Sequence, residues 1–297
     1  MFKGSITALI TPLKNGKVDE KAFQDLIEWQ INQGSHGFVP CGTTGESPTL
    51  THEEHERVID LCIEAANGKV PVIAGTGSNS TDEAISLTKF SKEVGADAAL
   101  VVTPYYNKPT QEGLYRHFKA INDSCDLPII IYNIPGRSVV DINIETMKKL
   151  AKLKNIIGVK DSSNDLARPL LTTKNIGKNF CQISGEDATV VPFLSQGGHG
   201  CISVTANIAP KMCSDLHNAW QKGNFKKVQS LNSFLFPLHN VLFLETSPGP
   251  VKYAASLLKI CSEELRLPLV KVAPNTKKEI KSILTKLKIK PIKKNKC

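Results

Sequence analysis

Eight short runs of apolar, often β-branched residues recur along the first two thirds of the chain. They fall at roughly residues 4–10, 36–41, 70–75, 97–103, 127–132, 156–160, 180–184 and 199–204. Continuous apolar runs of this length are typical of parallel strands that are covered on both faces. The pattern therefore predicts eight buried parallel strands.

Helical spacing fills most of the gaps between these runs. Residues 19–33 place Phe23, Leu26 and Ile27 near one face, and residues 81–94 and 143–153 show similar periodicity. Eight strands that alternate with helices predict a TIM (β/α)8 barrel, and residues 1–224 have a suitable length for it. A doubly wound open sheet is the alternative fold, but nothing in the chain matches its GxGxxG turn.

The strand pattern ends near residue 225, and apolar residues then follow helical spacing, as in Val228, Leu231 and Leu235. Prolines at positions 248, 250, 268 and 274 interrupt this region. We predict a catalytic barrel of residues 1–224 followed by a small helical domain of residues 225–297.

The net charge of +9 arises in the last part of the chain. Residues 271–297 contain ten lysines and one glutamate, whereas residues 1–270 contain 27 basic and 27 acidic side chains. A lysine-rich, solvated helix accounts for this excess better than a nucleic-acid-binding groove does. We therefore expect no nucleic-acid partner.

The eight cysteines are scattered and form no CxxC pair, which argues against a zinc ribbon or a redox dithiol. Cys41, Cys181 and Cys201 lie inside apolar runs and are expected in the core. No apolar stretch approaches the roughly 18 residues of a membrane helix, and the apolar start is too short for a signal peptide. We expect a cytoplasmic protein with no membrane partner.

In a (β/α)8 barrel the active site lies at the carboxyl ends of the strands. The run at 156–160 ends in Lys160. Burial at that position favours the neutral amine, which can form a Schiff base with a carbonyl substrate. Taken alone, a lysine that reaches solvent would be the simpler interpretation.

Other strand ends supply polar partners for Lys160. The segment 42–47, GTTGES, has glycines that permit unusual backbone angles and N–H groups that can bind an anion. Tyr105 and Tyr106 follow one apolar run, and Tyr132 and Arg137 follow the next; a phenol can relay protons and an arginine suits a carboxylate. An ordinary turn and packed aromatic rings are the simpler alternatives for each feature alone. Together these groups predict a class I aldolase-type reaction on a 2-oxo acid.

Thr51 and Glu54 form a predicted capping box at the start of a helix. His52 and His55 follow at i, i+3 spacing, and HEEH is not the HExxH motif of zinc proteases. We favour a polar helix face over a metal site here, and a small-ligand site stays open.

With these residues assembled, the chain resembles the dihydrodipicolinate synthase family, part of the N-acetylneuraminate lyase superfamily of pyruvate-dependent Schiff-base lyases. The resemblance extends from residue 1 into the helical tail. It rests jointly on GTTGES at 42–47, VTPYYNKP at 102–109, YNIPGR at 132–137, GVKDSS at 158–163 and GHGCISVTAN at 198–207.

This resemblance implies a reaction in which Lys160 forms an imine with pyruvate. The derived enamine attacks L-aspartate 4-semialdehyde, a step of diaminopimelate and lysine biosynthesis. No metal and no organic cofactor is implied, because the imine itself is the electron sink. The implied proton relay consists of Tyr132, Thr43 and Tyr106, with Tyr106 lent by a neighbouring subunit of a homo-oligomer that is usually a dimer of dimers.

Further binding residues also follow from the resemblance. The implied substrate contacts are Thr44 for the pyruvate carboxylate, Arg137 for the semialdehyde, and Gly185 and Ile202 for the pocket wall. An inhibitory L-lysine site is implied at the dimer interface, with Glu83 holding an ammonium group. Its implied residues are Ser47, His52, His55, Asn79, Glu83 and Tyr105.

Two alternative functions remain at this stage. One is another pyruvate-dependent class I aldolase, such as an N-acetylneuraminate lyase or a 2-keto-3-deoxy sugar acid aldolase. Arg137 favours the synthase reaction, because sialic-acid lyases resemble the YNIP pattern but generally lack this arginine. The other is a catalytically silent sensor of pyruvate or lysine, which the joint presence of lysine, tyrosines, threonine and arginine disfavours.

Overall fold

The computed structural model describes residues 1–292, and eight parallel strands form its centre. Along the sheet the order is β4, β1, β10, β9, β8, β7, β6, β5, and a bridge between Phe38 and Val72 joins the two ends. The TIM (β/α)8 barrel predicted from the sequence is confirmed. The strands are β1 (Gly4–Ala8), β4 (Gly37–Val39), β5 (Ile73–Gly75), β6 (Ala98–Val102), β7 (Ile129–Asn133), β8 (Ile156–Asp161), β9 (Cys181–Ser184) and β10 (Gly200–Ser203).

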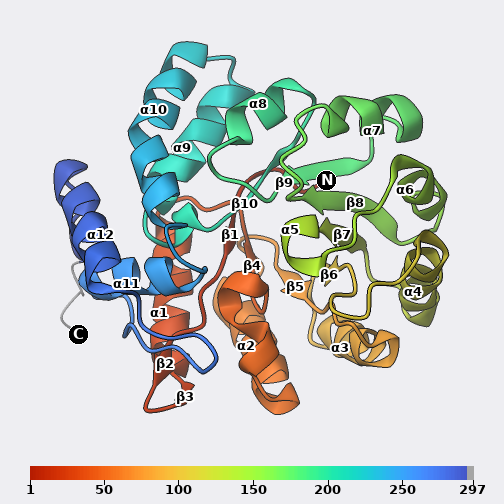
Figure 1. Ribbon diagram of the computed structural model, residues 1–297, viewed down its shortest axis with the longest axis horizontal. Helices are drawn as coiled ribbons and strands as arrows, with labels where there is room; N and C mark the ends of the chain where they lie inside the picture. The colour runs from red at the N-terminus through yellow and green to blue at the C-terminus, as the bar shows by residue number, and fades with distance from the viewer. Residues whose placement is uncertain (293–297) are drawn as a thin grey trace.

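Helices surround the strands on the outside, as Figure 1 shows in a view into the barrel. Thr51 accepts a hydrogen bond from the Glu54 N–H and Glu54 reaches back to the Thr51 N–H, so the predicted capping box is present. These helices are α1 (Glu20–Asn32), α2 (His52–Ala66), α3 (Thr81–Glu93), α4 (Gln111–Ser124), α5 (Pro135–Ser138), α6 (Ile144–Leu150), α7 (Arg168–Ile176), α8 (Val190–Ser195) and α9 (Pro210–Gln221).

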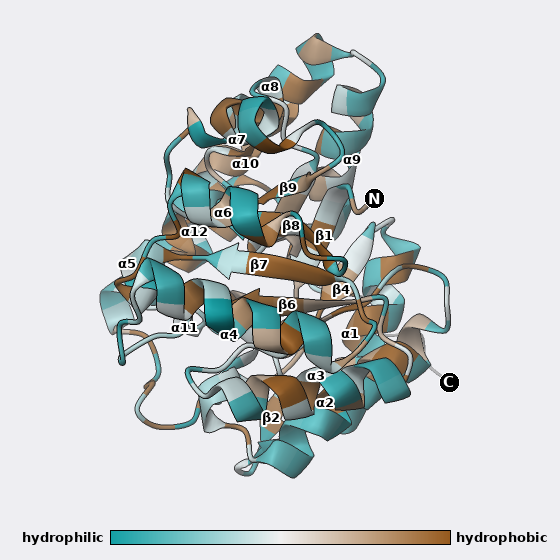
Figure 2. Cartoon of the chain, turned by 90° about the vertical axis from the view of Figure 1, so that its right-hand side faces the viewer, coloured by the Kyte–Doolittle hydropathy of each residue, from teal (hydrophilic) through white to brown (hydrophobic). Residues whose placement is uncertain are grey.

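Side chains alternate between the barrel interior and the helix layer. Ile130 and Tyr132 of β7 belong to the inner cluster, whereas Ile129 and Ile131 pack with the surrounding helices. Figure 2 shows β6 and β7 as hydrophobic along most of their length, while the outward face of α2 is hydrophilic. The strands are thus covered on both faces, which explains their continuous apolar runs.

After residue 224 the described chain forms α10 (Phe225–Val241), α11 (Gly249–Leu257) and α12 (Pro274–Lys286), which gather at one side of the barrel (Figure 1). Leu235 and Leu238 of α10 share a hydrophobic cluster with Cys213 and Leu216 of α9. The division into a barrel of residues 1–224 and a helical domain of residues 225–297 remains our proposal. In the described residues no helix is long and apolar enough to cross a membrane.

The remaining short elements frame the barrel mouth and its edges. A two-stranded antiparallel hairpin, β2 (Leu13–Lys14) and β3 (Lys17–Val18), follows β1. The segment after β4 forms two turns of 3-10 helix, η1 (Thr43–Gly45) and η2 (Ser47–Thr49), and a third, η3 (Thr205–Asn207), follows β10.

Candidate active site

Lys160 lies near the carboxyl end of β8 and is directed into the barrel by strand alternation. Its neighbour Val159 belongs to the outer cluster, and Lys160 itself is 6% exposed. In the sheet Lys160 pairs in register with Tyr132 of β7. The Lys160 Nζ atom lies 3.8 Å from the centroid of the Tyr132 ring. The structure therefore brings together the two residues on which the predicted chemistry depends most.

Gly185 leaves the space that the Lys160 side chain needs. A Cβ atom at this position would lie 3.0 Å from Lys160 Cε and 1.8 Å from Ser162 Oγ. Ile202 of β10 is 1% exposed and belongs to the inner cluster of the barrel. Both predicted pocket residues are thus at the inner wall near the strand ends, and a side chain at position 185 would have to displace Ser162 Oγ.

The predicted anion-binding turn follows β4 and contains the two threonines. Thr43 is half-buried and Thr44 is buried, both within η1. The turn is tightly hydrogen-bonded, because the Gly45 N–H donates to the Gly42 carbonyl at 3.0 Å and the Glu46 N–H donates to the Thr43 carbonyl at 3.2 Å. The threonine positions are therefore set by a rigid loop at the barrel mouth.

Arg137 is on α5, the single turn of helix that follows β7. Its side chain is exposed, and Nη2 donates to the carbonyl oxygen of Ser247 at 3.4 Å. Ser247 belongs to the segment between α10 and α11, so the C-terminal region reaches the rim of the barrel. Arg137 thus lies at the entrance side, separate from the buried Lys160 and Tyr132 pair.

The paired tyrosines after β6 have different environments. Tyr105 is half-buried, and burial raises the pKa of its phenol. Tyr106 is 89% exposed and has a left-handed backbone angle, φ 73°. A non-glycine residue in this conformation is strained, which is frequent at functional sites.

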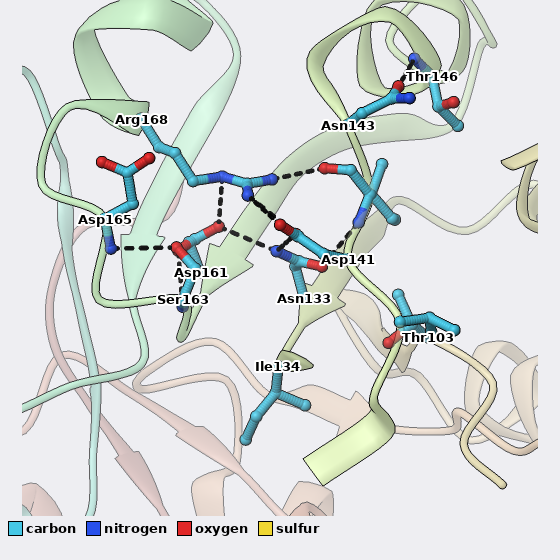
Figure 3. A network of polar contacts seen from close by, with 12 residues as sticks. Thr103, Asn133, Ile134, Asp141, Asn143, Thr146, Asp161, Ser163, Asp165 and Arg168 are labelled. Atoms are coloured by element: carbon cyan, nitrogen blue, oxygen red, sulfur yellow. Dashed lines mark hydrogen bonds and ion pairs between the residues drawn. The ribbon is translucent and has the colours of Figure 1, made fainter. Parts of the chain in front are cut away.

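A polar network on the outer side of the barrel joins the ends of β7 and β8 (Figure 3). Arg168 donates from Nη1 to Asp141 at 2.8 Å, and its Nε lies 3.2 Å from Asp161 Oδ2. The Asn133 amide donates to Asp141 at 2.8 Å and to Asp161 at 3.3 Å. Asn133 directly follows Tyr132, and Asp161 directly follows Lys160. The network therefore holds the two strand ends that position the candidate catalytic pair.

The predicted inhibitor residues are partly brought together. The His52 Nε2 atom is 2.6 Å from Glu83 Oε1, and the Asn79 carbonyl accepts from the Asn107 side chain at 2.9 Å. His55 differs from the expected polar helix face. It is buried, and its Nε2 lies 2.7 Å from the Gly75 carbonyl oxygen. Ser47 is half-buried in η2, at the mouth-side end of the same region.

Two residues near Lys160 were not singled out by the sequence. Ser162 is buried, and its Oγ lies against Gly185. Partial burial raises the pKa of the Glu186 carboxyl, whereas the positive charge of Lys160 acts to lower it. Only their positions in the sequence could have indicated them, since Ser162 is two residues after Lys160 and Glu186 directly follows Gly185.

The fold and the site define the class of this protein, which is a (β/α)8-barrel enzyme with a buried lysine beside a tyrosine at the strand ends. The chain belongs to the dihydrodipicolinate synthetase family, whose model matches residues 1–287. A relative from Rhodospirillum centenum, a 4-hydroxy-tetrahydrodipicolinate synthase, is 64% identical over 96% of this chain and 98% of its own. The predicted family and synthase activity are confirmed by these matches.

Solved structures agree with this placement. The dihydrodipicolinate synthase of Aquifex aeolicus superposes with a TM-score of 0.96 at 46% identity, covering 99% of this chain and 100% of its own. The chloride-inhibited enzyme of Acinetobacter baumannii, complexed with pyruvate, has a TM-score of 0.95 at 45% identity, with coverages of 97% and 100%. The enzyme of Cyanidioschyzon merolae with lysine bound has a TM-score of 0.94 at 36% identity, with coverages of 97% and 99%.

Proposed function

We propose that the enzyme condenses pyruvate with L-aspartate 4-semialdehyde, the 4-hydroxy-tetrahydrodipicolinate synthase reaction of diaminopimelate and lysine biosynthesis. The observation that carries this proposal is the buried Lys160 with its Nζ 3.8 Å from the Tyr132 ring centroid, in a chain of this family. A lysine amine held at a strand end beside a tyrosine is suited to attack on a carbonyl carbon, and the product of that attack is a Schiff base.

The first half of the reaction forms the nucleophile. The Lys160 amine attacks the keto carbon of pyruvate and gives a carbinolamine, which loses water to form an imine. A proton then leaves the methyl group, and its electron pair moves toward the imine nitrogen to give an enamine. We assign the proton transfers to Tyr132, with Thr43 and the partner-supplied Tyr106 completing the relay.

In the second half the enamine carbon attacks the aldehyde of the second substrate. The substrate's own amino group then adds to the imine carbon, displaces Lys160 and closes the ring. No metal or organic cofactor takes part in this scheme, because the protonated imine accepts the electron pair. Every covalent step is therefore assigned to groups of the protein and its two substrates.

Substrate binding is assigned to residues around this pair. Thr44 and the N–H groups that precede Gly45 in the 42–47 turn are proposed to hold the pyruvate carboxylate, supported by the buried position of Thr44. Gly185 and Ile202 form the proposed pocket wall. Arg137 is proposed to bind the carboxylate of the semialdehyde, supported by its exposed guanidinium at the rim.

Trapping with borohydride tests this assignment directly. The protein is incubated with pyruvate and reduced, and the modified peptide is mapped by mass spectrometry. We expect one adduct on Lys160, none in Lys160→Ala, and an unchanged adduct in the matched control Lys154→Ala, whose lysine is on the surface. Absence of any adduct on the folded wild-type protein would remove the Schiff-base mechanism.

The second substrate is tested by comparing aldehydes. The pyruvate-loaded enzyme is assayed with L-aspartate 4-semialdehyde, and cleavage of sialic acid and of 2-keto-3-deoxy sugar acids is measured in parallel. We expect turnover only with the semialdehyde, and Arg137→Ala should raise its KM more than that of pyruvate. Faster cleavage of a sugar acid would instead identify an aldolase.

We also propose a homotetramer arranged as a dimer of dimers. Tyr106 supports one interface, because it is 89% exposed in a single chain yet is assigned to the proton relay. Leu170 and Leu171 of α7 support a second interface, because each is 45% exposed on an apolar surface. Sedimentation velocity over a range of concentrations tests this assembly.

Inhibition by L-lysine is proposed at the cluster of His52, Glu83 and Tyr105. Glu83 is supported as the ammonium partner because its carboxylate already accepts a hydrogen bond from a ring nitrogen, with Oε1 2.6 Å from His52 Nε2. Ser47, Asn79 and His55 complete the proposed set. If millimolar L-lysine leaves the rate unchanged, this part of the proposal is wrong. A cytoplasmic location is proposed from the unpaired state of the described cysteines.

A further inference from the structure

A buried ion pair joins the C-terminal helices to the 42–47 turn. Lys252 of α11 donates from Nζ to Glu46 Oε1 at 2.6 Å, and the side chains of Lys252 and Glu46 are 0% and 2% exposed. The two residues are 206 positions apart in the chain. Neither side chain has a role in the reaction proposed above.

Burial makes this pair an unusual choice for stability alone. Removing two charges from water has a large desolvation penalty, and well-packed apolar residues of the same volume often stabilise a core equally well. An ion pair, however, fixes the distance and direction between its partners more sharply than an apolar contact does. The pair is therefore better explained by the position it imposes on Glu46.

Glu46 is held at both carboxylate oxygens and at its backbone. Oε1 is bound by Lys252, and Oε2 accepts the backbone N–H of Arg266 at 3.2 Å. Its backbone is in the left-handed region, φ 57°, a conformation that a non-glycine residue adopts only when its surroundings fix it. Glu46 is thus constrained both at its side chain and at its backbone.

The rest of the turn is tied to the same frame. The Arg266 guanidinium donates to the Thr49 carbonyl at 2.7 Å and binds Glu54 with two nitrogens, at 2.5 and 2.6 Å. On the barrel side, the Thr11 hydroxyl donates to the Gly45 carbonyl at 2.7 Å. The turn is therefore held between the end of the first barrel strand and the C-terminal helices.

We propose that Lys252 and Glu46 are positioning residues that set the 42–47 turn for pyruvate. Their pairing fixes the left-handed residue that follows Gly45, and with it the orientation of Thr44 and of the N–H groups preceding it. This inference rests on the proposed function, because it concerns how the pyruvate carboxylate is received. It also assigns a role to the helical C-terminal part, which supplies one half of the pair.

The test removes both charges together, as K252M with E46Q, so that neither charge is left unpaired in the core. We expect this double variant to fold and to form the Lys160 adduct at saturating pyruvate. The KM for pyruvate should rise about tenfold, the effect of losing one well-placed contact to a charged group, while kcat changes less. The matched control is K277M with E263Q, an ion pair at 2.6 Å in the same C-terminal region that does not touch the turn.

Each outcome decides the proposal. A pyruvate KM equal to that of the control would overturn it. Glu46→Asp, which keeps the charge but shortens the side chain by one methylene, is the second variant and should also raise the pyruvate KM. If the double variant does not fold, an unchanged KM in Glu46→Asp overturns the proposal. Borohydride trapping of the wild-type protein in parallel distinguishes failure of this proposal from failure of the proposed function. An absent Lys160 adduct in the wild-type protein would refute the proposed function itself.

Discussion

Gly185 is the residue at which the barrel leaves least room beside Lys160. A methyl group there would lie 1.8 Å from Ser162 Oγ and 3.0 Å from Lys160 Cε. We expect Gly185→Ala to lower the free energy of unfolding by about 1–3 kcal/mol through overpacking, and to reduce imine formation by displacing the lysine. Chemical denaturation and the rate of borohydride trapping measure the two effects.

A control and a rescue accompany this substitution. Gly136→Ala introduces a methyl group with no atom within 4 Å, so its stability should stay within about 0.5 kcal/mol of wild type. Adding Ser162→Ala to Gly185→Ala removes the closest atom and should restore part of the stability. If Gly185→Ala traps pyruvate as fast as wild type, the spatial argument for Gly185 is wrong.

The ion pair of His52 and Glu83 is sensitive to pH. The hydrogen bond that His52 donates to Glu83 raises the pKa of His52 above 6.5, and hydrogen bonds from Ser78 and then His52 lower the pKa of Glu83 below 4.5. The contribution of His52 is therefore fully present below 6.5 and is lost as pH rises through its raised pKa. That of Glu83 is present above 4.5 and is lost as pH falls through its lowered pKa.

An NMR titration of the His52 ring protons measures the effect of Glu83 on the pKa of His52. We expect the pKa of His52 to lie above 6.5 and Glu83→Gln to bring it back toward that value. Glu56→Gln, on the same helix but further from the ring, should shift the pKa less. Equal shifts in the two variants would show that general surface charge, and not this contact, sets the pKa.

At the scale of elements, Arg168 joins α7 to the ends of β7 and β8. Its guanidinium contacts Asp161, whose side chain is 8% exposed, and loss of one partner of a buried pair costs about 3 kcal/mol. Arg168→Leu should therefore destabilise the protein by about this amount. It should also lower kcat, since Asn133 and Asp161 adjoin Tyr132 and Lys160.

The matched control for this variant is Arg116→Leu. Arg116 pairs with Glu112 on the surface of α4 and is 77% exposed. Its loss should change stability by no more than about 0.5 kcal/mol, because exposed ion pairs contribute little. Denaturation midpoints and kcat values are measured for both variants. Equal kcat values in Arg168→Leu and Arg116→Leu would contradict a positioning role for the network.

At the scale of the whole molecule, a shared active site predicts complementation between inactive chains. Lys160→Ala lacks the nucleophile, and Tyr106→Phe lacks the phenol supplied to the neighbour. In a mixed dimer one site has both defects and the other has none. Refolding an equal mixture should therefore restore about a quarter of wild-type activity, as expected for random pairing in a symmetric dimer.

Separate assays of each variant provide the control for complementation. Both should have little activity alone, and mixing them without dissociation should change nothing. If the refolded mixture is no more active than its components, Tyr106 acts within its own chain or not at all.

The lysine-rich C-terminal segment, which comprises α12 and the residues after it, is expected to matter through its apolar side chains. Lys278, Lys281, Lys288 and Lys290 are exposed, so replacing all four with Gln should leave kcat unchanged and stability within about 0.5 kcal/mol. Ile280 on the same segment is fully buried, and Ile280→Ala should cost about 2–5 kcal/mol. Thermal unfolding measures the loss of stability in each variant. A larger loss in the four-lysine variant than in Ile280→Ala would contradict this prediction.

The sequence by itself determined the strands of the barrel and the candidate residues at their ends. Each strand is encoded in a local apolar run, and helices are encoded in local periodicity, so the eight strands of the barrel could be read from neighbouring residues. Lys160 and Tyr132 could be predicted as site residues for the same reason, because each lies at the end of such a run. Local pattern also placed the capping box at Thr51.

Only the tertiary structure decided which distant residues meet. The pairing of β8 with β9 places Gly185 against Ser162, and Lys252 reaches Glu46 from 206 residues away. Arg168 meets Asp141 and Asp161 for the same reason. His55 is buried although its local sequence is polar, because α2 lies against Gly75 of β5. Periodicity specifies which face of an element is buried, whereas contacts between elements depend on distances that only the folded chain defines.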